Sequence, residues 1–111
     1  MKAILCKEYG PAETLVIEDV PSPEAKGRGV KVRVKAAGLN FPDTLIIEGK
    51  YQLKPTMPFS PGGEMSGEVI AVGDKVTRFK VGDRVAGLTG YGAFAEEVIV
   101  PEHNLLPVPE G

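Results

Sequence analysis

Residues 30–36 read VKVRVKA, and this stretch indicates the fold class. Apolar residues stand at every second position, with a lysine or an arginine between them. A period of two is the pattern of a β-strand that buries one face and exposes the other. The face expected in the core carries Val30, Val32, Val34 and Ala36.

Segments of similar length flank this strand on both sides. KAILCK (2–7) and LVIEDV (15–20) predict two strands, with a Gly-Pro turn at residues 10 and 11 between them. The 14 glycines and 10 prolines are spread along the chain between apolar segments. The sequence therefore predicts one mainly β domain, a small, partly open barrel with one or two short helices. Four further strands are expected in GEVIAV (67–72), KVTRFKV (75–81), RVAGL (84–88) and AFAEEVIVP (93–101).

One short helix is expected directly after residues 30–36. Pro42 and Asp43 suit a first helical turn, where a missing N–H is harmless and a carboxylate is favourable. Gly49 is placed as a C-terminal stop, which predicts a helix of about two turns. The proline-rich residues 50–63 are expected to form an irregular loop, and LLPVPEG (105–111) an extended linker.

The composition is that of an ordinary globular protein. Charged residues make up 25% and the formal net charge is -2, so neither nucleic acid nor a membrane is expected as a partner. No apolar run approaches the ~20 residues that span a bilayer. Cys6 is the single cysteine, so an intrachain disulfide is impossible and we expect a cytoplasmic protein.

The sequence has no motif for metal, phosphate or nucleophilic chemistry. Zinc needs three or four ligands at close spacing, whereas Cys6 and His103 stand far apart. The glycines of GLTGYG (87–92) lead into a predicted strand, so no helix N-terminus follows them to bind a phosphate. The pattern Gly-x-Ser-x-Gly is absent. Glu96 and Glu97 are expected to point to opposite faces of a strand, so they cannot act as a pair.

A polar and aromatic cluster remains, at the predicted helix start and on the loops. It comprises Asn40, Phe41, Asp43, Tyr51 and Glu64. Loops on a rigid scaffold are where binding residues concentrate, which favours a site. Each residue also has an ordinary explanation, as a helix cap, a partner of the helix dipole, a surface aromatic or a turn residue. The residues alone leave both interpretations open.

Three longer segments, in this order and spacing, carry a family resemblance. They read VRVKAAGLNFPDTLIIEGKY (32–51), MPFSPGGEMSGEVIAVGDKVTRFKVGDRVAGL (57–88) and GAFAEEVIVP (92–101). The chain resembles the N-terminal, GroES-like domain of medium-chain dehydrogenase/reductases, in particular the zinc-independent NADPH:quinone oxidoreductases related to zeta-crystallin. Zinc enzymes of that superfamily carry a Cys-His pair and a Gly-His-Glu where this chain has Asn40-Phe41 and Gly62-Gly63-Glu64. The resemblance implies that Asn40 and Gly63 replace two metal ligands, and that no zinc is bound.

The resemblance also implies roles for the cluster. Asn40 would be catalytic, with its amide N–H donated to the oxygen that gains charge. Tyr51 would be catalytic and would also contact the nicotinamide of the cofactor. Phe41 and Asp43 would line or support the substrate pocket. Glu64 would have a structural role, tied to backbone donors of its loop.

The activity implied is hydride transfer from NADPH to a quinone or another conjugated carbonyl, such as an enone or an enoyl thioester. Residues 1–111 would be the substrate-side domain of that reductase. A nucleotide-binding Rossmann domain is expected after residue 111, the whole protein is expected to be a homodimer, and the isolated domain an inactive monomer. Two other interpretations stay open. One is a free-standing, co-chaperonin-like or small-ligand-binding barrel, and the other is a zinc alcohol dehydrogenase that places its metal differently.

Overall fold

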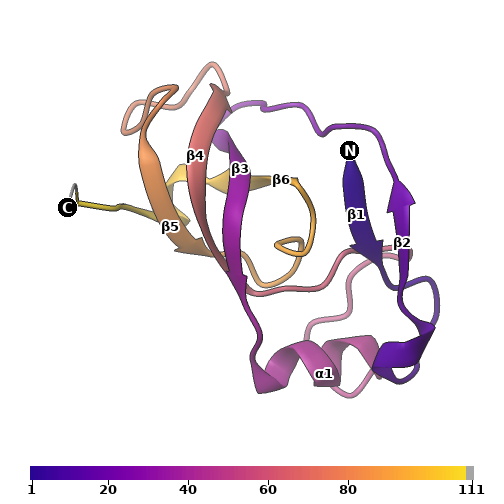
Figure 1. Ribbon diagram of the computed structural model, residues 1–111. Coiled ribbons are helices and arrows are strands. Elements are labelled where there is room, and N and C mark those ends of the chain that lie inside the picture. The colour runs from indigo at the N-terminus through magenta and orange to yellow at the C-terminus, as the bar shows by residue number, and fades with distance from the viewer. Residues whose placement is uncertain (110–111) are drawn as a thin grey trace.

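The computed structural model describes residues 1–109 and consists of two antiparallel sheets and one helix. The smaller sheet pairs β1 (Lys2–Leu5) with β2 (Val16–Asp19), which are connected through the 3-10 turn η1 (Ala12–Thr14). The larger sheet has the strand order β6-β3-β4-β5-β7. Figure 1 shows helix α1 (Phe41–Ile47) between the lower ends of the two sheets. The five strands are β3 (Gly29–Gly38), β4 (Glu64–Val72), β5 (Arg84–Leu88), β6 (Glu97–Pro101) and β7 (Leu105–Pro107).

The larger sheet is strongly curled. Its two edge strands, β6 and β7, are joined by only the short 3-10 turn η2 (Glu102–Asn104). A three-residue connection requires the two edges of the sheet to approach each other, and in Figure 1 β6 crosses behind β3 and β4. The sheets do not join into a closed barrel within the described residues. The expected mainly β, GroES-like partial barrel with a short helix is confirmed.

The main core lies inside this curl. Val30 and Val32 are fully buried, as the alternation predicted. Ala36 was expected on the same face but is exposed, because the pairing of β3 with β4 shifts register between Val34 and Ala36. Such an irregularity reverses the facing of the residues that follow it. The buried cluster comprises Val30, Val32, Met65, Val69, Val85, Ala93, Val98, Val100 and Leu105.

A second, smaller core holds α1 in place. Ile46 and Ile47 of the helix pack with Cys6 and Phe59, and Cys6 also pairs with Phe59 in a backbone bridge. Cys6 is 1% exposed and is a small buried residue of this core. Burial raises the pKa of the Cys6 thiol, although a backbone hydrogen bond with Glu8 opposes the effect. The thiol is therefore a packing group and not a reactive nucleophile.

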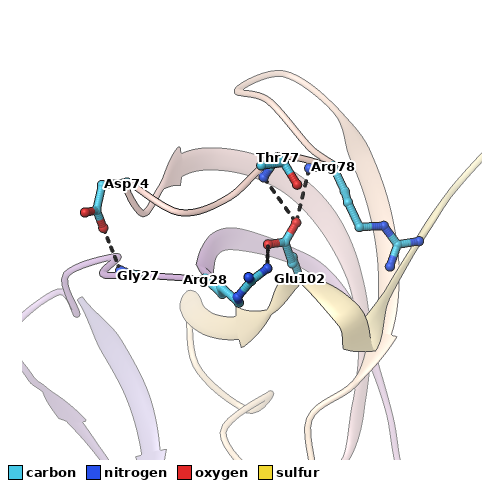
Figure 2. Close-up of polar contacts among 6 residues, drawn as sticks. All are labelled: Gly27, Arg28, Asp74, Thr77, Arg78 and Glu102. Carbon is cyan, nitrogen blue, oxygen red and sulfur yellow. Dashed lines mark hydrogen bonds and ion pairs between the residues drawn. The ribbon is translucent and has the colours of Figure 1, made fainter.

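The strand predicted at residues 75–81 is wrong. This segment forms turns and bends, and the backbone N–H groups of Thr77 and Arg78 donate to Glu102 Oε1 at 3.2 and 3.1 Å. Figure 2 shows Glu102 also facing Arg28, whose guanidinium lies 3.4 Å from Oε2. Glu102 is 2% exposed. Because this carboxylate satisfies the backbone donors, the segment needs no neighbouring strand.

The linker predicted at residues 105–111 is also wrong over its first part. Leu105–Pro107 forms β7, which pairs with β5, and Leu105 is 1% exposed. The last two residues of that segment, 110 and 111, lie outside the described part of the chain. Among residues 1–109, no helix has the length and apolar character needed to cross a membrane.

Candidate functional site

The start of α1 is built by residues that the sequence singled out. Asn40 precedes the helix in an extended conformation, with φ -134° and ψ 160°. Its backbone N–H donates to Asp43 Oδ2 at 2.9 Å, which is the carboxylate half of a capping box. Pro42 occupies the first turn, as expected. The helix therefore fixes the backbone from which the Asn40 side chain projects.

The end of α1 is fixed equally well. Gly49 has φ +73°, and its N–H donates to Ile46 O, while the N–H of Lys50 donates to Leu45 O. These two bonds form a Schellman motif, which favours glycine at this position. The predicted helix and its stop are confirmed. The chain leaves the helix through Lys50 and reaches Tyr51 two residues after Gly49.

A cleft of about 600 Å³ opens between α1, the loop after it and the edge of β4. It brings together four of the five residues of the predicted cluster: Asn40, Asp43, Tyr51 and Glu64. Phe41 does not line it. Phe41 is 73% exposed and borders a second hollow of about 350 Å³, which Asn40 and Asp43 also line. Asn40 thus lines both hollows, whereas its sequence neighbour Phe41 lines only the second.

Asp43 lies at the base of the cleft. It is 7% exposed, and its Oδ2 accepts the Asn40 hydrogen bond. Its other oxygen, Oδ1, faces Gly63, since a Cβ added to Gly63 would lie 3.7 Å from it. A buried carboxylate is tolerated where it is hydrogen-bonded, and here it also meets the positive end of α1. Asp43 is thus a support beneath Asn40 that also lines the cleft.

Glu64 begins β4 at the rim of the cleft. Its backbone pairs with Gly38 on one side and Leu88 on the other. Its side chain lies over Gly38, where an added Cβ would come within 2.0 Å of Oε1. Among residues 1–109, no hydrogen bond joins its carboxylate to a backbone donor, so the expected tie to the loop is not seen. Its structural role stays a prediction.

Several lining residues were missed by the sequence analysis. Ile46 was discoverable, because it lies three residues after Asp43 on the same face of the helix. Leu88 reaches the cleft only through the pairing of β5 with β4, which no local pattern reveals. The remaining members come from the helix start and the loops: Pro42, Gln52, Leu53, Gly63 and Gly90.

Within residues 1–109, no three His, Cys, Asp or Glu side chains lie close enough together to hold a metal ion. Asp43 and Glu64 are the only two such residues lining the cleft in this part of the chain. Position 63, where the resemblance places a histidine in zinc enzymes, is a glycine.

Comparison with known proteins agrees with this architecture. Residues 26–110 match the family described as Alcohol dehydrogenase GroES-like domain. The chain belongs to this family. This GroES-like domain is 47% identical over 110 residues to a quinone oxidoreductase-like protein 2 homolog from Nematostella vectensis, a match that covers 97% of the chain and 30% of that protein.

Two solved structures show the same likeness. A quinone oxidoreductase from Pseudomonas syringae superposes with a TM-score of 0.91 at 47% identity, covering 98% of this chain and 34% of that one. The quinone oxidoreductase of Escherichia coli complexed with NADPH gives a TM-score of 0.92 at 29% identity, over 98% and 33% of the two chains. The predicted resemblance to quinone oxidoreductases is confirmed. The GroES-like domain spans about a third of the length of these relatives.

Proposed function

We propose that this GroES-like domain is the substrate-side part of an NADPH-dependent, zinc-independent reductase that transfers hydride to a quinone or another conjugated carbonyl. The observation that carries the proposal is the cleft in which Asn40 and Tyr51 face one space with largely apolar walls. Such a cleft suits a flat, neutral acceptor. The relatives named quinone oxidoreductases support the same substrate class.

In this proposal the chain's own residues orient the acceptor and stabilise charge. The Asn40 amide donates a hydrogen bond to the carbonyl oxygen as that oxygen becomes negative. The backbone clamp from Asp43 keeps Asn40 in place, so little reorganisation is needed during the reaction. Tyr51, which is 37% exposed, offers a ring and a hydroxyl at the mouth of the cleft. Pro42, Ile46 and Leu88 exclude water from the apolar wall.

NADPH, when bound, supplies the hydride. The cleft fits the nicotinamide end of that cofactor, because Tyr51 offers an aromatic edge and Gln52 an amide. It does not fit the phosphates, because no Lys, Arg or His lines it in the described part of the chain. We therefore include a nucleotide-binding domain after residue 111 in the proposal, together with a homodimer and a cytoplasmic location. By itself the 111-residue domain is then inactive.

The positions of Phe41, Asp43 and Glu64 around the cleft suggest their roles in the proposed reaction. Phe41 would contact only an acceptor that extends past the helix start into the second hollow. Asp43 is a positioning residue, and it would also contact the acceptor at the base of the cleft. Glu64 supports the rim. An electrophilic acceptor such as a quinone needs no Lewis acid, so the proposal includes no zinc.

The co-chaperonin alternative has less support. That function would need a long mobile loop with an apolar tip, and residues 50–63 would have to provide it. Phe59 in this segment is 4% exposed and bridges to Cys6, and Met57 packs against the same smaller core, so the segment is fixed to the domain although Leu53 is exposed. Size-exclusion chromatography distinguishes the two, because a ring-forming co-chaperonin would elute as a large oligomer.

Steady-state kinetics test the proposal. The protein at its natural length should oxidise NADPH in a saturable, quinone-dependent way that is insensitive to chelators, whereas residues 1–111 alone should not. Failure of the longer protein with every neutral quinone would overturn the reductase proposal. Activity that is lost with a chelator and restored by zinc would overturn the zinc-independent part.

A further inference from the structure

The walls of the cleft carry charge of only one sign. Asp43 and Glu64 line it, and no cationic side chain does so within residues 1–109. Lys50 and Lys54 stand next to the lining residues Tyr51 and Leu53 in the chain, but neither lysine is part of the lining, and Lys50 is paired with Glu48 at 3.2 Å. A group that enters the cleft therefore meets two carboxylates and, among the described lining residues, no cationic side chain.

The space at Gly63 is bordered by two oxygen atoms. A Cβ added there would lie 3.6 Å from Gly90 O and 3.7 Å from Asp43 Oδ1, which is ordinary van der Waals separation. The absent side chain thus leaves a notch, flanked by a carbonyl and a carboxylate oxygen. Those oxygens are acceptors only, so they suit the C–H edge of an electron-poor ring and repel an anion.

We propose that this cleft accepts uncharged carbonyl acceptors and rejects those that carry an anionic group beside the reacting carbonyl. The inference rests on the proposed function and narrows its substrate class to neutral ring quinones and enones. We take an anionic group about 7 Å from each of the two carboxylates, at an effective dielectric constant between those of water and of a protein interior. The repulsion then weakens binding of the anion by about tenfold or more. Acceptors that bear sulfonate, carboxylate or phosphate on the ring are therefore poor ligands.

The test uses a matched pair of acceptors and the protein at its natural length. The neutral acceptor is 2-methyl-1,4-naphthoquinone, and the anionic one is 1,4-naphthoquinone-2-sulfonate. Dissociation constants are measured without NADPH, by following the amide NMR signals of Gly63 and Tyr51. We expect the sulfonate to bind at least about tenfold more weakly, and the difference to shrink when salt is raised from low to high concentration.

Two variants locate the effect. Glu64→Gln removes one cleft charge and should reduce the ratio of the two dissociation constants about threefold or more. Glu68→Gln removes the same charge four residues further along β4, where Glu68 lies opposite Arg33 and Arg84 and does not line the cleft. This control should leave the discrimination unchanged.

The outcomes separate this inference from the proposed function. Equal affinity for both quinones, tighter binding of the sulfonate, or no movement of the Gly63 and Tyr51 signals with either quinone would overturn the inference. An equal response of Glu64→Gln and Glu68→Gln would overturn the assignment to the cleft. Selective binding of the neutral quinone without any NADPH oxidation would leave the inference standing and refute the reductase proposal.

Discussion

Asn40 and Asp43 clamp each other at the start of α1. The Asn40 N–H donates to Asp43 Oδ2 at 2.9 Å, and the Asp43 N–H donates to Asn40 O at 3.0 Å. The proposed donor to the substrate is thereby fixed by a carboxylate that is 7% exposed. Asn40 was expected to be either a helix cap or part of a site; it caps the start of α1 and also lines the cleft, and its role in the reaction stays a proposal.

Replacing the Asn40 amide should separate its contribution to helix capping from its proposed hydrogen bond to the substrate. Asn40→Asp keeps a good helix-capping side chain but replaces the N–H donor with an acceptor, so the melting temperature should change little. The rate constant kcat for quinone reduction should fall at least about tenfold, since a donor to the developing oxyanion is lost. Asn40→Ala should lose activity and also about 1 kcal/mol of stability. Unchanged kcat in both variants would remove Asn40 from the catalytic machinery.

Removing the Asp43 carboxylate should affect stability first. Asp43→Ala leaves the Asn40 N–H without its partner and removes a negative charge from the helix start, which should cost about 1–2 kcal/mol in the free energy of unfolding. Asp43→Asn retains an acceptor oxygen and should cost less. Urea unfolding of both variants measures the difference. Equal losses in the two would show that the hydrogen bond from Asn40 contributes nothing.

Two glycines of the sheet should respond differently to alanine. At Gly67 an added Cβ would lie 2.1 Å from the backbone carbonyl oxygen of Arg33, which cannot move without breaking strand pairing. Gly67→Ala should therefore lose about 2 kcal/mol or more. At Gly38 the close contact is the flexible end of Glu64, so Gly38→Ala should lose less than about 1 kcal/mol while displacing Glu64 from the rim. Thermal unfolding of both variants gives the comparison.

Glu102 should make stability depend on pH under acidic conditions. Burial by itself would raise the pKa of Glu102, but hydrogen bonds from the Thr77 and Arg78 backbones and the charge of Arg28 outweigh it, so the pKa lies below its ordinary 4.5. The unfolded chain therefore binds a proton at higher pH than the folded one. The stabilisation is complete above pH 4.5 and is lost as the pH falls from there through the folded pKa.

Unfolding of Glu102→Gln at several pH values checks this prediction. The variant should be less stable than the wild type near neutral pH, and the gap should narrow between about pH 5 and pH 3. The other acidic residues with lowered pKa values, Asp83 and Glu97, are present in both proteins and cancel in the comparison. A gap that stays constant over this range would contradict the shifted pKa.

Local patterns predicted the strands and the helix where each segment supplied its own signal. The alternation at residues 30–34 and the Pro42 and Gly49 ends of α1 are examples. Prediction failed where a distant group satisfies the backbone. Residues 75–81 have the composition of a strand, but Glu102, more than twenty positions away, accepts their N–H groups. The prolines that follow Leu105 are typical of a linker, but Leu105 begins β7, which pairs with the edge of β5.

The candidate site shows the same division. At the helix start, Asn40 contacts Asp43, which is three positions further along the chain. A contact at such short spacing can be predicted from the sequence. Leu88 joins them only because β5 pairs with β4 beside Glu64. Phe41 follows Asn40 in sequence yet lines only the second hollow, whereas Asn40 lines both. Adjacency in sequence was therefore a poor guide to adjacency in the cleft.

The most direct test of the account is the structure of the natural-length protein with NADPH and a neutral naphthoquinone bound. The account predicts the quinone in the cleft, with a carbonyl oxygen about 3 Å from the Asn40 amide nitrogen and its ring beside Tyr51. A quinone bound elsewhere while the cleft between Asn40, Tyr51 and Glu64 stays free of it would contradict the account.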